Sequence, residues 1–592
     1  MTGGYGTKEK ASMNRFEVGT GEFLLNGRPF KVYSGAIHYF RVPREYWKDR
    51  LQKLKACGFN TVETYVAWNS HMPRRGCFLT EGMLDLGAFL DTARELGLYA
   101  IVRPGPYICS EWEAGGLPWW LMKGDIRLRC MDREYLESVD EYFDLLMPIL
   151  VPRQITRGGN IILMQAENEY GSYGDDLRYM NYIKDALVNR GAEVPIFTSD
   201  GDCKWMLTGG EAQGALRTVN FGSDPDRNFA SLRQYNPDGP LMCGEFWLGW
   251  FDHWGEEHHS RSPEEAAQSF ERILDRGASV NVYMFHGGTN FGFMNGANCT
   301  REGEYQPTVN SYDDDALLTE WGDITPKYRL FRDALKRHGA PVDENEPEPT
   351  AKRAYGRVEL KPVCDVTSWA KQHIQPIKSG NPVSMEEAGQ ATGFILYSAF
   401  FRGPREELRL ETDGLADRAY VLVDGRFKGV IYRNSKSDIC VEIPEKGAQI
   451  DLLVENMGRT NYGIFLKDPK GVKAVRLGQM FLFGWETYSL PMDDVSGMRS
   501  ETSDESFVPT LFEGEFDAGD TPRDTFIRTD GFKKGVVFVN GKPLSRYWEI
   551  GPQKTCYLPA PFMNKGVNKL QVLELEGYDK AELILTDVPE LG

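Results

Sequence analysis

Short apolar runs alternate with amphipathic segments over the first 340 residues of the chain. Several runs are apolar at nearly every position, which is typical of parallel strands covered on both faces. Between two of them, residues 134–150 carry apolar side chains at helical spacing. Eight strands in strict alternation with helices favour a closed (β/α)8 TIM barrel, here over residues 13–340, rather than an open sheet. The predicted strands are residues 32–38, 61–66, 99–104, 161–169, 196–201, 218–222, 241–246 and 280–287.

The pattern changes at residues 341–353, where proline and acidic residues predict a linker. Beyond it, short strands with turn signals replace the helical segments. Residues 419–429 and 535–544 each contain an apolar strand, an Asp-Gly or Asn-Gly turn and a second strand, which predicts a β-hairpin. We therefore expect two all-β sandwich domains of the jelly-roll or galactose-binding kind, over residues 354–495 and 496–592.

Charge and composition exclude several classes of partner. The formal net charge of −18 argues against nucleic acid and against an anionic membrane surface. No apolar run approaches the roughly 18 residues of a membrane span, and residues 1–12, which could be a leader or a tag before Met13, lack the apolar centre of a signal peptide. The ten cysteines form no CxxC pair. Reduced thiols and a cytoplasmic location are therefore expected.

No cofactor and no metal ion are expected. His258 and His259 stand beside two glutamates, but no third ligand at regular spacing accompanies them. No glycine-rich phosphate fingerprint follows any predicted strand, which argues against a nucleotide. A neutral small molecule remains as the expected partner, and a homodimer is considered as the assembly.

Two glutamates end apolar runs beside aromatic and glycine residues. Glu169 closes the run 161–169, and Glu245 lies near the end of the run 241–247. The C-terminal ends of barrel strands carry the chemistry of this fold. One glutamate at such a place is more often a solvated loop residue, but two acids that face one pocket can cleave a glycosidic bond. Glu167 is a rival for the acid role, although we expect it to point inward below the pocket as a paired structural acid.

Aromatic side chains near the predicted strand ends could form a sugar-binding platform. Their flat faces suit the C–H side of a sugar ring, while carboxylates and amides bind its hydroxyls. Trp112, Trp247 and Trp250 are the best candidates. Core packing around the barrel mouth is an equally good explanation of each one.

Six motifs spread along the chain carry a specific combination of residues. Together they resemble glycoside hydrolase family 35, the β-galactosidases, over nearly the whole chain. The similarity is greatest to the shorter, cytoplasmic bacterial members, several of which favour galactose in β-1,3 linkage. The motifs are residues 34–43, 103–109, 111–118, 167–171 and 283–291, with residues 546–554 resembling the last domain of the family.

The resemblance implies an exo-acting, retaining β-galactosidase that removes terminal β-D-galactose from a galactoside oligosaccharide through a covalent intermediate. It implies that Glu169 is the acid/base, that Glu245 is the nucleophile and that Asn168 binds the 2-hydroxyl of the sugar. Trp247 and Trp250 are expected to carry the aglycone. Further substrate-binding positions implied by the family or placed near the barrel mouth are Tyr65, Cys109, Ser110, Glu111, Tyr283 and Tyr462.

Three positions depart from the family pattern, and they keep two alternatives open. Met72 replaces a typical glutamate, Leu248 replaces a polar residue, and Asp314 stands where a tyrosine near C6 of the sugar is usual. An acid near the sugar could attract an amino sugar, so a β-glucosaminidase is one alternative. A protein that binds galactosides without cleaving them is the other.

Overall fold

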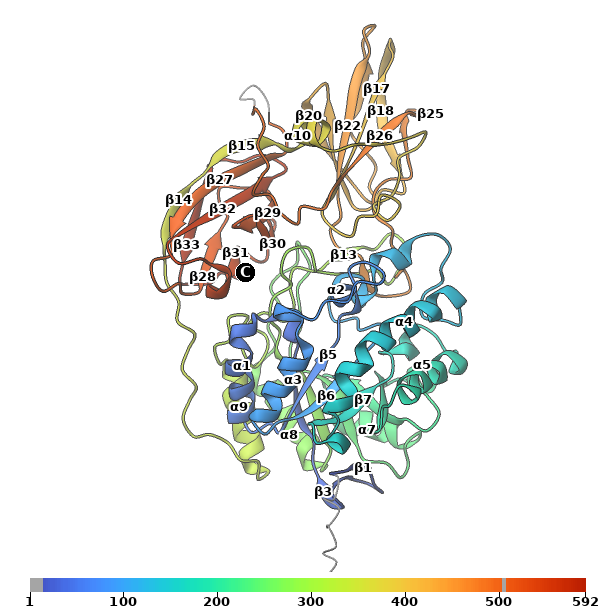
Figure 1. The fold of residues 1–592 in the computed structure, drawn as a ribbon, viewed down its shortest axis with the longest axis vertical. Coiled ribbons are helices and arrows are strands. Elements are labelled where there is room, and N and C mark those ends of the chain that lie inside the picture. Colours follow the sequence, from blue (N-terminus) through green and yellow to red (C-terminus); the bar gives the residue numbers. More distant parts are fainter. Residues whose placement is uncertain (1–13, 503–506) are drawn as a thin grey trace, which may run out of the picture.

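The computed structural model describes residues 14–502 and 507–592, and the first half of the chain forms a closed barrel (Figure 1). Eight parallel strands follow one another around the barrel, and pairing between the last and the first closes it. All eight predicted strands are confirmed. They are β4 (Tyr33–Ile37), β5 (Thr61–Tyr65), β6 (Tyr99–Arg103), β7 (Ile161–Gln165), β8 (Ile196–Gly201), β9 (Leu216–Phe221), β10 (Met242–Trp247) and β11 (Ser279–His286).

Helices cover the outside of this barrel, and their sequences explain where they begin. The longest is α4 (Arg133–Leu150), which buries Val139, Phe143 and Leu146 on one face. Each such side chain contributes about 2 kcal/mol of burial free energy. Helix α8 begins after Ser262, whose side chain accepts a hydrogen bond from the Glu265 backbone N–H. The other covering helices are α1 (Trp47–Ala56), α3 (Leu86–Glu95), α5 (Leu177–Asn189), α6 (Lys204–Gly209), α7 (Pro225–Arg233), α8 (Pro263–Asp275) and α9 (Pro326–Arg337).

The first β-sandwich packs a six-stranded sheet on a four-stranded sheet. Its core is built from both, for example Tyr397 and Leu452 from the first sheet and Leu410 from the second. The six-stranded sheet runs β16 (Ile377–Ser379), β26 (Trp485–Leu490), β17 (Phe394–Phe401), β22 (Ala448–Glu455), β19 (Arg418–Val423), β20 (Arg426–Tyr432). The other runs β21 (Cys440–Ile443), β18 (Arg405–Asp413), β24 (Ala474–Leu477), β25 (Met480–Phe481).

The second β-sandwich packs a five-stranded sheet on a four-stranded sheet, and its core includes Phe512, Val572 and Leu583. It also packs against the first sandwich, since Leu396 and Phe538 share one apolar cluster. The five-stranded sheet runs β15 (Lys361–Asp365), β27 (Thr510–Asp517), β32 (Val567–Glu574), β29 (Lys534–Val539), β30 (Lys542–Trp548). The other runs β14 (Gly356–Glu359), β33 (Glu582–Thr586), β28 (Thr525–Arg528), β31 (Thr555–Leu558).

The division of the chain between the two sandwiches differs from the predicted one, in which the first sandwich begins at residue 354. Strands β14 and β15 fall inside the range expected for the first sandwich, yet they pair with β33 and β27 of the second. The chain therefore enters the second sandwich, leaves it to build the first, and then returns. Pairing over more than 140 residues leaves no local sequence signal, because it depends on distant partners.

Both predicted hairpins are confirmed, and their turns explain the sequence. Strands β19 and β20 pair around Asp424 and Gly425, and strands β29 and β30 pair around Asn540 and Gly541. All four turn residues have positive φ, as a two-residue type I′ turn requires. Asp, Asn and Gly adopt that conformation at the lowest cost.

The sandwiches lie together over one end of the barrel, and the N-terminal strands β1 (Phe16–Val18) and β3 (Arg28–Phe30) lie near the other (Figure 1). Between Arg337 and Gly356 the chain forms no helix or strand and runs along the outside of the molecule (Figure 1). Within residues 14–502 and 507–592, no helix has both the length and the apolar character that a membrane crossing requires.

Candidate active site

A cavity of about 270 Å³ opens at the C-terminal ends of the barrel strands, beneath the first sandwich. Eleven of the residues predicted for the site line it. They come from strands β5, β10 and β11, from the loops that follow β6, β7 and β10, and from the first sandwich. The eleven are Tyr65, Cys109, Ser110, Glu111, Asn168, Glu169, Glu245, Trp247, Trp250, Tyr283 and Tyr462.

Glu169 follows strand β7 and is held in a left-handed backbone conformation, with φ of 44°. Its backbone N–H donates to the Ser199 carbonyl at 3.1 Å, and the Asn220 amide donates to its Oε1 at 3.1 Å. Burial and the charge of Glu245 raise the pKa of Glu169 to about 8. Glu169 is therefore protonated at neutral pH and can act as an acid.

Glu245 is fixed by three hydrogen-bond donors on three different side chains. The Tyr65 hydroxyl and the Arg103 guanidinium donate to its Oε1 at 2.8 and 2.6 Å. The Trp247 indole N–H donates to its Oε2 at 3.0 Å. These donors orient both oxygens and complement a negative charge, as a carboxylate nucleophile requires. Trp247, predicted as part of an aglycone platform, thus also contacts Glu245, the predicted nucleophile.

Asn168 is oriented by the same network. Its Oδ1 accepts hydrogen bonds from Arg103 at 2.7 Å and Gln165 at 3.1 Å, and it lies 2.8 Å from the Tyr65 hydroxyl oxygen. Arginine can only donate, so the amide oxygen must face it and the NH2 group must face the other way. This leaves the Asn168 NH2 group free to donate to a sugar hydroxyl in the cavity.

The third acid of the cavity, Glu111, lies on a strained loop. Cys109, Ser110 and Glu111 have φ of 56°, 63° and 50°, values that side chains other than glycine rarely adopt. Such strain gathers at functional sites when the surroundings hold it in place. Burial raises the pKa of Glu111 to about 7, partly offset by the Arg41 cation. The Tyr283 hydroxyl also contacts Glu111, at 3.4 Å.

Four residues that the sequence did not single out complete the lining: Phe251, Asn298, Tyr312 and Asn461. Asn461 and Tyr462 belong to strand β23 (Thr460–Tyr462) of the first sandwich, which pairs with the short barrel strand β12 (Ala297–Asn298). This segment of the sandwich therefore reaches the barrel mouth, where Tyr462 was expected. Nothing in the residue pattern around Asn298 marks it as part of the cavity.

Trp112, named as a platform candidate, does not line the cavity. Its ring is buried against Phe40, with ring centroids 4.7 Å apart, and its indole N–H donates to Asn69 at 3.1 Å. The packing explanation is therefore correct for Trp112. Trp250, by contrast, lines the cavity and is 40% exposed at its mouth.

The three departures from the family pattern lie outside the cavity lining. Met72 and Leu248 are fully buried. Asp314 contacts His258 at 3.0 Å, while Tyr312, two residues earlier, faces the cavity. The expectation that Asp314 stands in the tyrosine position near the sugar is therefore wrong, because the turn at this segment directs Tyr312 inward.

Glu167, the rival acid, is also outside the cavity. Its two oxygens accept hydrogen bonds from Nε and Nη2 of Arg129 at 2.9 and 2.7 Å, and Tyr179 donates to it at 2.9 Å. The side chain is fully buried. A carboxylate paired in this way is a structural acid, as predicted.

Asp252, His258 and Asp313 lie close enough to hold a metal ion. His258, however, places Nδ1 2.7 Å from Asp252 and Nε2 3.0 Å from Asp314. Its hydrogen bonds to these carboxylates raise the pKa of His258 to about 10. A protonated imidazole has no lone pair to offer, so these residues suit a charged link between two loops better than a metal site.

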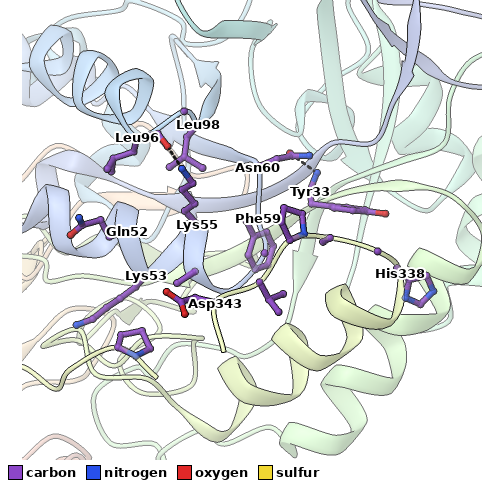
Figure 2. A pocket seen from close by; sticks show the side chains of 18 of the residues that line it. Tyr33, Gln52, Lys53, Lys55, Phe59, Asn60, Leu96, Leu98, His338 and Asp343 are labelled. Carbon is purple, nitrogen blue, oxygen red and sulfur yellow. Dashed lines mark hydrogen bonds between the residues drawn. The ribbon is translucent and has the colours of Figure 1, made fainter. Parts of the chain in front are cut away.

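A larger cavity, of about 1120 Å³, lies at the opposite end of the barrel. Tyr33, Asn60 and Leu98, which stand at or just before the N-terminal ends of barrel strands, line it (Figure 2). Lys55 projects there, but its ammonium group donates to the Leu96 carbonyl at 2.6 Å (Figure 2). None of the predicted site residues lies in this cavity.

Comparison with known proteins agrees with this geometry. Residues 22–338 match the model of the family described as glycosyl hydrolases family 35. Residues 382–491 match "Beta-galactosidase, first all-beta domain", and residues 509–568 match "Beta-galactosidase, galactose-binding domain". These matches follow the barrel and the two sandwiches in order.

Two human proteins are similar over almost the whole chain. Beta-galactosidase-1-like protein 2 is 43% identical, covering 96% of this chain and 91% of its own length. Human Beta-galactosidase is 41% identical, covering 96% and 88%. Bovine Beta-galactosidase is 41% identical, covering 94% and 89%. Similarity to bacterial members of the family stays an expectation. The chain is a glycoside hydrolase, and it belongs to glycosyl hydrolases family 35.

Proposed function

We propose that the protein is an exo-acting, retaining β-galactosidase that removes terminal β-D-galactose from oligosaccharides. The observation that carries the proposal is one cavity holding two glutamates in different surroundings. Glu169 has its pKa raised by burial and by the charge of Glu245, and Glu245 is held by three donors. An acid and a charged nucleophile in one cavity are what double displacement requires.

In the first step, Glu245 attacks the anomeric carbon and the bond to the leaving oxygen breaks. Glu169 gives its proton to that oxygen, so the aglycone leaves as an alcohol. The Asn168 amide donates to the 2-hydroxyl, a contact that strengthens as positive charge grows on the ring. The product of this step is a galactosyl ester of Glu245.

In the second step, water attacks the anomeric carbon from the side that the aglycone has left. Glu169, now ionised, takes a proton from this water, and the ester bond to Glu245 breaks. Free galactose leaves with its original anomeric configuration, and both glutamates return to their starting states. The same carboxyl thus serves as acid and then as base.

Removal of single terminal sugars fits the size of the cavity. Its volume, about 270 Å³, is below the roughly 300–1,000 Å³ typical of sites for drug-sized ligands. Tyr283 and Glu111 contact each other in its lining. Their hydroxyl and carboxyl groups are of the kind that binds the hydroxyls of one sugar. The similar proteins named Beta-galactosidase support galactose as that sugar.

We further propose a preference for β-1,3 linkage and a reducing, cytoplasmic location. The linkage follows from the resemblance to shorter family members. The location is supported by ten cysteines that are all free thiols. A β-glucosaminidase has less support, because Asp314, the residue that suggested it, contacts His258 and not the cavity.

The test is a panel of nitrophenyl glycosides followed by galactobioses of β-1,3, β-1,4 and β-1,6 linkage. The proposal predicts turnover of the β-galactoside well above the glucosaminide, and the highest kcat/KM on the β-1,3 disaccharide. Glu245→Gln should lose at least about 10⁴-fold of the activity. Binding of galactose without any turnover by the wild type would instead support a galactoside-binding protein.

A further inference from the structure

One buried arginine joins the first sandwich to the strained loop of the active site. Arg459 precedes strand β23, and its Nη1 donates to Oε1 of Glu113 in the barrel at 2.6 Å. Its Nε donates to Oε1 of Glu386 in the sandwich at 2.9 Å. The Arg459 and Glu386 side chains are at most 1% exposed, and that of Glu113 is 4% exposed. A cation thus bridges two buried anions across the domain boundary.

The barrel end of this bridge lies within the loop that carries three cavity residues. We call residues 107–116 the site loop. Glu113 stands two residues after Glu111, and Ala114, which also has positive φ (54°), donates its N–H to the Arg459 carbonyl at 3.3 Å. The Glu113 carboxylate also accepts from Asn69 at 3.1 Å. Side-chain and backbone contacts therefore both link Arg459 to this loop.

The sandwich end of the bridge lies equally close to the cavity. Two residues after Arg459, Asn461 lines the cavity and its carbonyl accepts a hydrogen bond from the Tyr107 hydroxyl of the site loop. The Asn461 amide donates to the Cys109 thiol at 3.5 Å. One short segment of the sandwich therefore contributes cavity lining and also holds the loop that forms the adjacent lining.

We propose that Arg459 is a positioning residue that, through Glu113, holds the site loop and strand β23 in the geometry required for galactoside hydrolysis. This rests on the proposed function of the cavity. Positive φ at four positions of the loop other than glycine persists only when the surroundings enforce it. Removing the guanidinium would leave two buried carboxylates without a counter-charge, which favours their separation.

Arg459→Met and Glu113→Gln test the proposal, with Arg50→Met as the matched control. Arg50 is also a buried guanidinium, and it donates to the Trp321 carbonyl at 2.6 Å without lining the cavity. Catalytic rates are divided by the number of sites that a 2-fluoro galactoside labels, so that unfolded molecules are not counted. Amide hydrogen exchange of the peptide covering residues 107–116 gives a second measurement that needs no activity.

We expect Arg459→Met to lower kcat/KM per labelled site about 100-fold, the size of effect that a shift of about 1 Å in catalytic geometry produces. Glu113→Gln should lose about tenfold, Arg459→Lys should recover part of the loss, and exchange in the site loop should rise in each. Arg50→Met should lower the Tm but leave kcat/KM per site and site-loop exchange unchanged.

Several outcomes would overturn the inference. Equal kinetics and equal loop exchange for Arg459→Met and Arg50→Met would show a purely structural role. If Arg459→Met does not fold, Glu113→Gln with kinetics and loop exchange like the wild type would have the same meaning. An inactive wild type would overturn the proposed function instead. The exchange measurement would then decide only whether Arg459 holds the site loop.

Discussion

The two ends of the barrel carry cavities that differ in volume and in the hydrogen bonds that their polar side chains make. The cavity at the C-terminal strand ends is about 270 Å³, whereas the one at the N-terminal ends is about 1120 Å³. In the larger one, the ammonium groups of Lys53 and Lys55 donate to backbone carbonyls at 2.9 and 2.6 Å. In the smaller one, only Asn220 among the described residues donates to the Glu169 carboxyl, which leaves an oxygen for a substrate.

The difference shows that free polar groups, rather than volume, mark the site of chemistry. The lysines of the larger cavity use donors of their ammonium groups on backbone carbonyls and so help to hold the base of the barrel together. Three glutamates around one small cavity raise the pKa of at least two members of the set, Glu169 and Glu111, through burial and mutual charge. Carboxyl groups with pKa values perturbed in this way are typical of sites where a reaction uses them.

After Glu245→Gln, the largest effect is expected from Glu169→Gln on substrates with poor leaving groups. Without a proton donor, kcat/KM on a galactose disaccharide should fall about 10³-fold. A dinitrophenyl galactoside needs no proton, so formation of the galactosyl enzyme should change little. Stopped-flow measurement of dinitrophenol release separates the two steps. A similar loss on both substrates would show that Glu169 is not the acid.

The pH dependence of kcat/KM should also report the protonation of Glu169. Glu169 has a pKa raised to about 8, so its protonated form is present below this pH and is lost above it. On the disaccharide, kcat/KM should therefore fall about tenfold per unit as the pH rises past 8. This limb should be absent for Glu169→Gln. An alkaline limb that persists unchanged in the variant would assign it to another group.

A smaller effect is expected at the cavity mouth. Trp250 is 40% exposed and stacks on Phe251, with ring centroids 5.1 Å apart. Trp250→Ala should raise KM for a disaccharide about tenfold and change nitrophenyl galactoside hydrolysis less. Trp247→Ala should reduce both, because its indole N–H also donates to Glu245. Equal losses on both substrates for Trp250→Ala would favour a packing role.

No kinetic effect is expected at the other end of the barrel. Lys55→Gln removes a charge from the larger cavity and a hydrogen bond to the Leu96 carbonyl. Steady-state rates on nitrophenyl galactoside should stay within about twofold, because surface substitutions far from the site have small effects. A large loss of kcat would mean that the larger cavity takes part in the reaction.

The barrel could be predicted because each strand carries its own signal. The runs that became β7 and β10 are apolar along almost their whole length, and the turns at Asp424-Gly425 and Asn540-Gly541 specify their hairpins locally. The pairing of β14 with β33 could not be predicted in this way. It joins segments more than 220 residues apart, and neither strand carries a mark of its partner.

The site was predictable where motifs carry the chemistry, and less so where geometry decides. Glu169 and Glu245 stand at strand ends, so they could be placed in one cavity. Tyr312 was missed in favour of Asp314, because a turn with Asp313 at φ of 47° sets which side chain points inward. Asn461 carries no distinguishing pattern, since its role depends on the sandwich that delivers it to the barrel.

Covalent labelling tests the central claim most directly. A 2-fluoro galactoside slows breakdown of the galactosyl enzyme, so the sugar should remain attached to the nucleophile. Mass spectrometry of the digested protein should find the label on Glu245, at one sugar per chain, with loss of activity in proportion. A label on Glu167 or Glu169, or inactivation without any covalent sugar, would contradict the assignment.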